Sequence, residues 1–291
     1  MINKFLNFLK DNFKKKNLDH QNLMLLIGQV HAKLNLNSNS KNINDYEFKA
    51  FSQWGEDGII DYLVSNIDIK NKTFIEFGVE HYEEANTKFL LLNKNWSGLI
   101  IDSSSDNINL IKKSELYWKY SLEVICEFIT KENINNIIQS STLKKEVGIL
   151  SIDIDGNDYW VWKEINVIEP SIVIIEYNAR LGKEKPYVVP YDKNFQREKK
   201  HYSMIYYGAS IQALVKLGRE KGYALVCCNK AGNNAFFVKK ELLNATIKEN
   251  SIDEVFYANK FRESRNFKGE LAYLDAKKES EIILKLPLIE I

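Results

Sequence analysis

Four oxygen-bearing side chains stand at the ends of two consecutive apolar runs. Asp153 and Asp155 lie at the end of the first run, and Glu176 and Asn178 lie at the end of the second. If both runs are adjacent parallel strands, these side chains meet at the edge where open α/β sheets bind ligands. Oxygen ligands suit a hard divalent cation, so the four residues are predicted to bind Mg²⁺ or Mn²⁺. The alternative is that the acids only bind a cofactor and orient loops.

A second group of candidate residues follows two earlier apolar runs. Glu76 and Gly78 come at the end of the first of these runs, and Asp102 ends the second. An acid at the place of Asp102 can accept hydrogen bonds from both hydroxyls of an adenosine ribose, although it can also cap the next helix. Gly78 lets the backbone approach a ligand closely, and Glu76 can accept a hydrogen bond from a ligand ammonium group.

The turn after Gly78 favours a cationic cofactor over a dinucleotide. A pyrophosphate site needs the G-x-G-x-x-G pattern, because glycines and a helix N-terminus must surround the phosphates. Here no second or third glycine follows, and the turn carries Glu80, Glu83 and Glu84. These carboxylates would repel a pyrophosphate, whereas a sulfonium or ammonium group fits them.

From Phe51 onward, short apolar runs alternate with helical stretches, which predicts an α/β fold. The predicted strands are Thr73–Phe77, Gly98–Asp102, Leu122–Ile129, Gly148–Ile154, Ile172–Glu176, Ala224–Cys228 and Asn234–Val238. The predicted helices are Asp57–Ser65, Thr87–Asn93, Asn107–Lys113, Ile134–Ser140, Trp160–Glu164 and Ser210–Lys221. Turn-forming residues at 228–234 favour a final hairpin. The expected core is therefore a doubly wound, seven-stranded, mostly parallel sheet.

Residues 1–45 are predicted to form a helical N-terminal extension. One apolar stripe contains Ile2, Phe5, Leu6, Leu9 and Phe13. A second pattern from Leu23 to Leu34 predicts another helix before a polar linker at residues 35–42. This pair is expected to dock on the body or on a second copy, giving a homo-oligomer, and a basic amphipathic helix can also contact a membrane surface. Residues 46–245 form the predicted main domain, and residues 246–291 a C-terminal extension that packs on it.

Composition restricts the class of protein further. The 291 residues have a formal net charge of +1, so no overall field selects nucleic acid as a partner. Cys126, Cys227 and Cys228 have neither disulfide nor zinc spacing, which fits a reducing compartment. No apolar run approaches the roughly 20 residues that span a bilayer, and no secretory cleavage site follows the N-terminus. We therefore expect a cytoplasmic protein.

Six short motifs occur in order over roughly residues 48–240. They are Phe51-Ser-Gln-Trp-Gly-Glu-Asp57, Phe74-Ile-Glu-Phe-Gly-Val79, Trp96-Ser-Gly-Leu99, Asp153-Ile-Asp-Gly156, Ile175-Glu-Tyr-Asn178 and Asn234-Ala-Phe-Phe237. This ordered set resembles FkbM-like class I S-adenosylmethionine-dependent methyltransferases, whose Rossmann-like sheet also ends in an antiparallel hairpin. One departure is the bulky, charged segment at residues 80–84, where many methyltransferases have further glycines.

The resemblance implies a methyltransferase domain at residues 46–245 that uses S-adenosylmethionine. It also implies O-methylation of a sugar or related group in a polysaccharide or natural product, so the expected partner is a small-molecule or glycan acceptor. Carried over by position, the residues expected on the cofactor side are Gln53, Glu76, Gly78 and Asp102. Asp153 and Asp155 fall where cofactor and substrate meet, with Asp153 touching the methyl donor.

Methyl transfer to a hydroxyl is an in-line displacement that depends mainly on positioning, and a base is needed as the hydroxyl becomes acidic. His81 and His201 are the candidate bases because histidine titrates near neutral pH, and Asp155 can serve instead. The segment from Asn178 to Tyr207 is expected to lie over the cleft. Its side chains suited to a sugar or phosphate are Arg180, Tyr187, Tyr191, Arg197, Tyr202, Tyr206 and Tyr207.

Two other functions stay open from the sequence. Asp153-Ile-Asp155 is a D-x-D motif, which in glycosyltransferases holds a metal against a nucleotide-sugar diphosphate. A binding protein without catalytic activity is the second alternative. Binding of S-adenosylhomocysteine or of a nucleotide sugar would distinguish the three possibilities.

Overall fold

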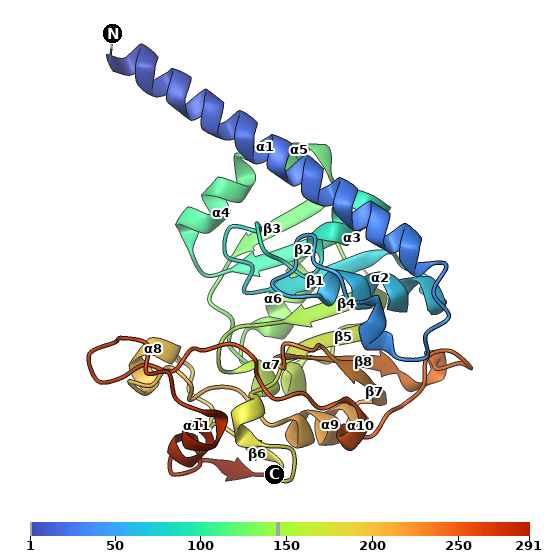
Figure 1. Cartoon of the computed structure of the whole chain (residues 1–291), viewed down its shortest axis with the longest axis vertical. Coiled ribbons are helices and arrows are strands. Elements are labelled where there is room, and N and C mark those ends of the chain that lie inside the picture. The colour runs from blue at the N-terminus through green and yellow to red at the C-terminus, as the bar shows by residue number, and fades with distance from the viewer. Residues whose placement is uncertain (1, 144–145) are drawn as a thin grey trace.

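The computed structural model describes the backbone of residues 2–143 and 146–291, and the side chains of residues 18–143 and 146–291. Its centre is one seven-stranded sheet in the order β3-β2-β1-β4-β5-β8-β7 (Figure 1). The strands are β1 (Thr73–Phe77), β2 (Ser97–Asp102), β3 (Leu122–Cys126), β4 (Glu146–Ile152), β5 (Glu169–Glu176), β7 (Tyr223–Cys228) and β8 (Asn234–Lys239). The first five run parallel, and β8 is antiparallel to both β5 and β7. This is the predicted doubly wound, seven-stranded, mostly parallel sheet.

Helices cover both faces of the sheet, because most of its strands are apolar on both sides. Phe74 packs on one face with residues of α2 (Glu56–Asn66), α3 (Lys88–Lys94) and α4 (Ser105–Lys112). Its neighbour Ile75 packs on the other face with residues of α6 (Ile134–Ser140), α7 (Asp158–Glu164) and α9 (Ile211–Glu220). All six predicted helices are confirmed, with ends that shift by a few residues. The short helix α5 (Glu115–Lys119) lies in a segment for which no helix is predicted.

Two predicted strands are too long at their carboxyl ends. The strand predicted to reach Ile154 ends at Ile152, because the Asp158 carboxylate accepts hydrogen bonds from the N–H groups of Ile154 and Gly156 at 2.9 Å each. These bonds turn the chain away from the sheet and into α7. The strand predicted to reach Ile129 ends at Cys126, so the following loop is free to form a wall of the cleft described below.

The N-terminal region is one helix, α1 (Ile2–Asn35), rather than the predicted pair. Residues 14–22, between the two apolar patterns, contain neither proline nor glycine, so nothing interrupts the helix. The stripe from Ile2 to Phe13 lies outside the residues whose side chains are described. Further along, α1 contacts α2 and α3, and Gly28 approaches Phe89 so closely that a Cβ atom would lie 2.6 Å from its ring. Among the described residues, no helix has the length and apolarity to cross a bilayer.

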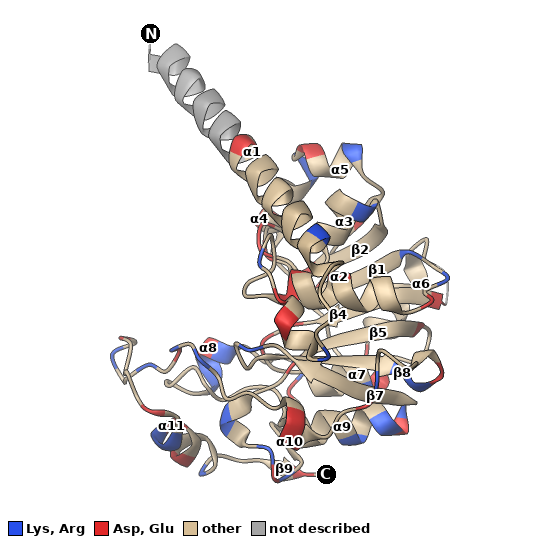
Figure 2. Ribbon diagram, turned by 45° about the vertical axis from the view of Figure 1, so that its right-hand side comes forward, with Lys and Arg blue, Asp and Glu red and all other residues tan. Residues whose placement is uncertain are grey.

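The C-terminal residues return to the body of the protein, where Figure 1 shows them beside α8 (Arg197–Lys200) and β6 (Tyr187–Val188). They form α10 (Ile252–Val255), α11 (Ala276–Ile283) and β9 (Ile289–Glu290), which pairs antiparallel with β6. Ile283, on α11, is fully buried in a hydrophobic cluster with residues of the segment from Leu181 to Tyr207. In Figure 2, acidic and basic residues are both spread over the ribbon, in agreement with the small net charge.

Candidate functional site

A cleft of about 420 Å³ opens beyond the carboxyl ends of β1, β2, β4 and β5. This is the place where the strand order predicts a ligand site. Among the described residues that line it, Arg197 is the single cation. The carboxylates that line it are Glu76, Glu80, Glu84, Asp102, Glu127, Asp153, Asp155, Glu176 and Glu263. The cleft is therefore strongly acidic and is suited to a cationic or neutral ligand rather than to a polyphosphate.

Gly78 closes β1 with a backbone conformation that other residues rarely adopt. Its φ is +72°, and its N–H donates to the carbonyl of Ile101 at 3.0 Å. A Cβ atom on Gly78 would lie 1.7 Å from the carbonyl oxygen of Asp153. The glycine is thus required because the turn after β1 packs directly on the loop after β4.

Asp102, at the end of β2, connects two loops of the cleft. One carboxylate oxygen accepts from the N–H of Glu80 at 2.8 Å, and the other accepts from the N–H of Ser104 at 2.8 Å. The side chain is 8% exposed and lines the cleft. Each carboxylate oxygen can accept more than one hydrogen bond, so Asp102 can position these loops and still accept from a ligand hydroxyl.

Glu76 holds the start of α3. Its carboxylate accepts from the N–H groups of Asn86 at 2.7 Å and Thr87 at 3.1 Å, and from the hydroxyl of Thr87. Burial raises the pKa of this carboxyl to about 7. Glu76 lines the cleft as predicted, but these bonds orient its oxygens toward the helix. Gln53 lines the cleft with an exposed side chain, and its carbonyl accepts from Lys49 Nζ at 2.8 Å.

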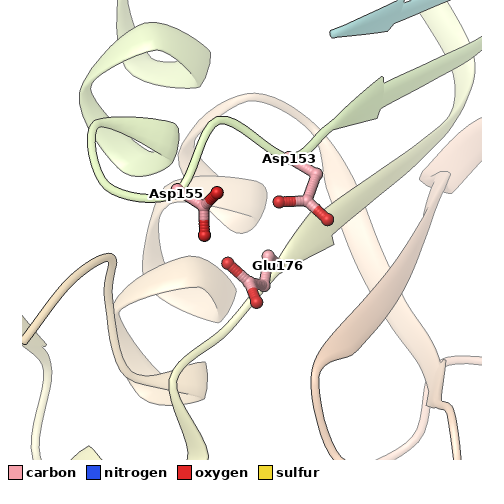
Figure 3. A group of neighbouring side chains, drawn as sticks. All are labelled: Asp153, Asp155 and Glu176. Carbon is pink, nitrogen blue, oxygen red and sulfur yellow. The ribbon is translucent and has the colours of Figure 1, made fainter. Parts of the chain in front are cut away.

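Asp153, Asp155 and Glu176 converge in the cleft, as Figure 3 shows. Each offers a carboxylate oxygen, and these oxygens all lie within 4.8 Å of one another. Burial, followed by the charge of Asp155, raises the pKa of Asp153 well above its ordinary value. Burial, followed by the charge of Asp153, does the same to the pKa of Glu176. The structure therefore brings together three of the four predicted metal ligands, and we call them the acidic triad.

The fourth predicted ligand, Asn178, is not part of this group. Its buried side-chain amide donates to the carbonyls of Ile205 at 2.9 Å and Tyr207 at 3.1 Å, and its oxygen accepts from the N–H of Arg180 at 3.2 Å. Asn178 instead caps the 3₁₀ turn η2 (Ala179–Leu181). The assignment as a ligand is wrong because the chain turns immediately after β5 and the amide is used in that turn.

Neither predicted histidine base lines the cleft. The side chain of His81 is 42% exposed and lies 3.4 Å from the carboxylate of Glu83. His201 packs on the ring of Tyr202, and its Nδ1 lies 2.6 Å from the hydroxyl of Ser203. Burial lowers the pKa of His201. The loops that carry these residues hold them outside the cleft, and of the three candidate bases only Asp155 lines it.

Of the side chains in the predicted acceptor segment that suit a sugar or phosphate, Arg197 is the one that lines the cleft. Its guanidinium binds Asp155 at 2.7 Å and Glu263 at 2.8 Å, and its Nε donates to the carbonyl of Met204 at 2.6 Å. Its guanidinium also lies 3.9 Å from the centre of the Tyr207 ring. The five tyrosines proposed for the acceptor do not line the cleft, and Arg180 is buried behind it.

Glu263 and Phe128 also line the cleft, and neither is among the residues predicted from the sequence. Glu263 comes from the C-terminal extension and completes the wall beside Arg197. Arg180 holds Glu263 at 3.1 Å and Glu279, on α11, at 2.6 Å. No local pattern marks Glu263, because its place depends on how the C-terminal extension docks. Phe128 follows β3 and leaves part of its ring exposed in the cleft, which the overlong strand prediction concealed.

No protein-family model and no curated protein matches the chain. Among solved structures, it is similar to the N-terminal domain of EvdMO1 with SAH bound, at 9% identity and a TM-score of 0.41 over 65% of this chain and 80% of that one. It is also similar to an O-methyltransferase family protein from Burkholderia thailandensis, at 11% identity and a TM-score of 0.40 over 64% and 58%. A third is TrmK of M. capricolum in complex with S-adenosyl-homocysteine, at 10% identity and 0.37 over 67% and 73%.

Proposed function

We propose that the protein is an S-adenosylmethionine-dependent O-methyltransferase that acts in the cytoplasm on a sugar or related hydroxyl group in surface polysaccharide biosynthesis. The observation that carries the proposal is an acidic cleft at the carboxyl ends of the parallel strands, with Asp102 at the end of β2. An acid at this place suits the two hydroxyls of a ribose. The remaining carboxylates suit a positively charged cofactor, and the cleft volume of about 420 Å³ is typical of small-molecule sites.

The residues present fit this cofactor. Asp102 would accept from the ribose, Phe128 offers an apolar ring for the adenine, and Gln53 and Gly78 also line the cleft. When bound, the cofactor supplies a methyl group on a positively charged sulfur. The chain's own residues would orient the acceptor, and Asp155, which lines the cleft, would take its proton.

A glycosyltransferase is the weaker candidate, although the acidic triad includes the D-x-D motif. A nucleotide diphosphate brings two or more negative charges, and Arg197 is the one cationic side chain among the described cleft residues. That guanidinium is already shared by Asp155 and Glu263. A divalent cation on the D-x-D motif would offset two of the diphosphate's charges, but the other cleft carboxylates, from Glu76 to Glu263, would still repel the phosphates. A titration with S-adenosylhomocysteine and, separately, with UDP-glucose should give binding only in the first case. Binding of UDP-glucose alone would favour the glycosyltransferase, and binding of neither would reject both enzymes.

Asp102→Ala should weaken the binding of S-adenosylhomocysteine at least tenfold, or about 1.4 kcal/mol, because two charge-assisted hydrogen bonds are lost. Isothermal titration calorimetry measures the effect. Asp106→Ala is the matched control, since Asp106 is exposed on the neighbouring helix α4 and should leave affinity unchanged. If Asp102→Ala binds as tightly as the native protein and has the same circular dichroism, Asp102 does not hold the cofactor.

A further inference from the structure

The acidic triad has less positive charge around it than its three carboxylates require. Among the described residues, Arg197 is the cation in contact with it, through Asp155, and Glu263 shares that guanidinium. Arg180 lies nearby but binds Glu263 and Glu279 instead. Carboxylates held this close repel one another unless a cation or a proton intervenes.

Glu176 shows that the triad is open to a ligand. The residue is 6% exposed, and its Oε2 has no hydrogen-bond partner in the described part of the chain. The other oxygen, Oε1, accepts a weak bond from the Tyr207 hydroxyl at 3.4 Å. A buried carboxylate oxygen without a donor is costly, and Figure 3 shows the Glu176 carboxylate directed toward those of Asp153 and Asp155. A cation held between the three carboxylates would therefore offer this carboxylate the partner that it lacks.

We propose that Asp153, Asp155 and Glu176 bind one hard divalent cation and that Arg197 competes with this cation for Asp155. The oxygens of the triad lie within 4.8 Å of one another, and three evenly spaced oxygens at about 2.3–2.6 Å from Ca²⁺ are about 4.0–4.5 Å apart, so a contraction of less than about 1 Å accommodates this ion. Mg²⁺ and Mn²⁺ hold oxygens at about 2.1 Å, so the three oxygens would approach one another by up to about 1.2 Å to bind them. The other coordination positions of such a cation would be open to water and to an acceptor oxygen.

Arg197 can release Asp155 to the cation without losing all of its own partners. Asp155 is the exposed member of the triad, with 61% of its side chain accessible, so it can move toward a cation at low cost. When it does, Arg197 keeps Glu263 at 2.8 Å and the Met204 carbonyl at 2.6 Å as partners. The guanidinium thus stays paired in both states, and the C-terminal extension supplies the residue that keeps it so.

A bound divalent cation would lower the pKa of a coordinated acceptor hydroxyl. This role rests on the proposed function, in which that hydroxyl is methylated. Cation binding itself does not depend on methyl transfer. It is measured without turnover, and S-adenosylhomocysteine binding tests the methyltransferase separately. Loss of either one therefore leaves the other measurable on the same preparation.

The test is a Mn²⁺ titration of the full chain, following the electron paramagnetic resonance signal of free Mn²⁺. We expect one Mn²⁺ per chain, displaced by excess Mg²⁺ or Ca²⁺. Asp153→Asn and Glu176→Gln should each weaken binding at least tenfold, whereas Glu127→Gln, which removes a cleft carboxylate outside the triad, should change it less than threefold. Arg197→Met should tighten binding at least threefold, because it removes both a repelling charge and the competitor for Asp155.

Thermal melting in EDTA shows whether the acidic triad serves a bound cation or stabilises the fold by itself. Without a cation, Asp153→Asn should melt at the same temperature as the native protein or higher, because one of three mutually repelling carboxylates becomes neutral. A folded native protein that takes up no Mn²⁺ at millimolar concentration would overturn the site, as would triad variants that bind like Glu127→Gln. If a folded Arg197→Met variant binds Mn²⁺ with the native affinity, Arg197 does not compete for the site. Arg197→Lys is the second substitution, for use if Arg197→Met does not fold.

Discussion

Replacing Arg180 with methionine should lower the free energy of unfolding by about 3–5 kcal/mol. The Arg180 guanidinium is almost fully buried, and it binds Glu279 at 2.6 Å and Glu263 at 3.1 Å. Glu279 is itself 2% exposed, so methionine would leave a buried charge without its counter-ion. Urea denaturation followed by circular dichroism measures the change. Because Glu263 lines the cleft, the loss should also loosen the wall around Arg197.

The control is Arg219→Met on α9, which breaks an ion pair of the same type at the surface. Arg219 lies 3.2 Å from Glu249, and both side chains are substantially exposed. Surface pairs of this kind contribute about 0–1 kcal/mol, so this variant should remain close to the native protein. The double variant Arg180→Met with Glu279→Met should recover part of the loss, since the uncompensated charge is gone. Equal stability of the Arg180 and Arg219 variants would show that the buried cluster does not hold the C-terminal extension.

Gly78→Ala should destabilise the protein by about 2–5 kcal/mol and abolish measurable binding of S-adenosylhomocysteine. A positive φ in a residue with a Cβ costs about 1–2 kcal/mol, and forcing atoms into a packed region adds about 1–3 kcal/mol. Here the added carbon would lie 1.7 Å from the Asp153 carbonyl, so the loop after β4 must move. That movement displaces Asp153 from the acidic triad. Urea denaturation and calorimetry measure the two effects.

Gly222→Ala separates the backbone effect from the clash. Gly222, between α9 and β7, has a φ of +86°, and a Cβ atom added to it would meet no other described atom within 4 Å. This substitution should therefore cost only the backbone term and leave cofactor binding unchanged. If Gly78→Ala and Gly222→Ala lose the same stability and both bind the cofactor, the contact between the two loops is not what requires glycine at position 78.

The sheet can be predicted because its signals are local. Each strand is a short apolar run between turn formers, and the helices between them carry their own periodicity. The carboxyl end of every parallel strand falls at the same edge, so the residues at those ends are expected to meet. Asp102, Asp153, Asp155 and Glu176 do line one cleft for this reason.

The path of the chain one or two residues beyond a strand depends on the turn, which the apolar pattern does not specify. Asp158 accepts two backbone N–H groups and ends β4 early, which leaves Asp155 in a positive-φ conformation facing Arg197. Asn178 uses its amide to shape the turn after β5 and so leaves the metal-ligand set. A strand that ends two residues earlier than predicted, or a turn that begins directly after it, therefore changes which side chains reach the cleft.

Contacts between distant parts of the chain follow from tertiary packing. The C-terminal extension carries Glu263 to the cleft and Glu279 to Arg180, across a separation in sequence that no periodicity spans. Both candidate histidines have suitable chemistry, yet loop packing holds them outside the cleft. The side-chain pattern of each segment is enough to predict the sheet and the edge at which the acids gather. How those acids are paired depends on the docking of separate segments, because ion pairs form only between charges that the fold brings within a few ångströms.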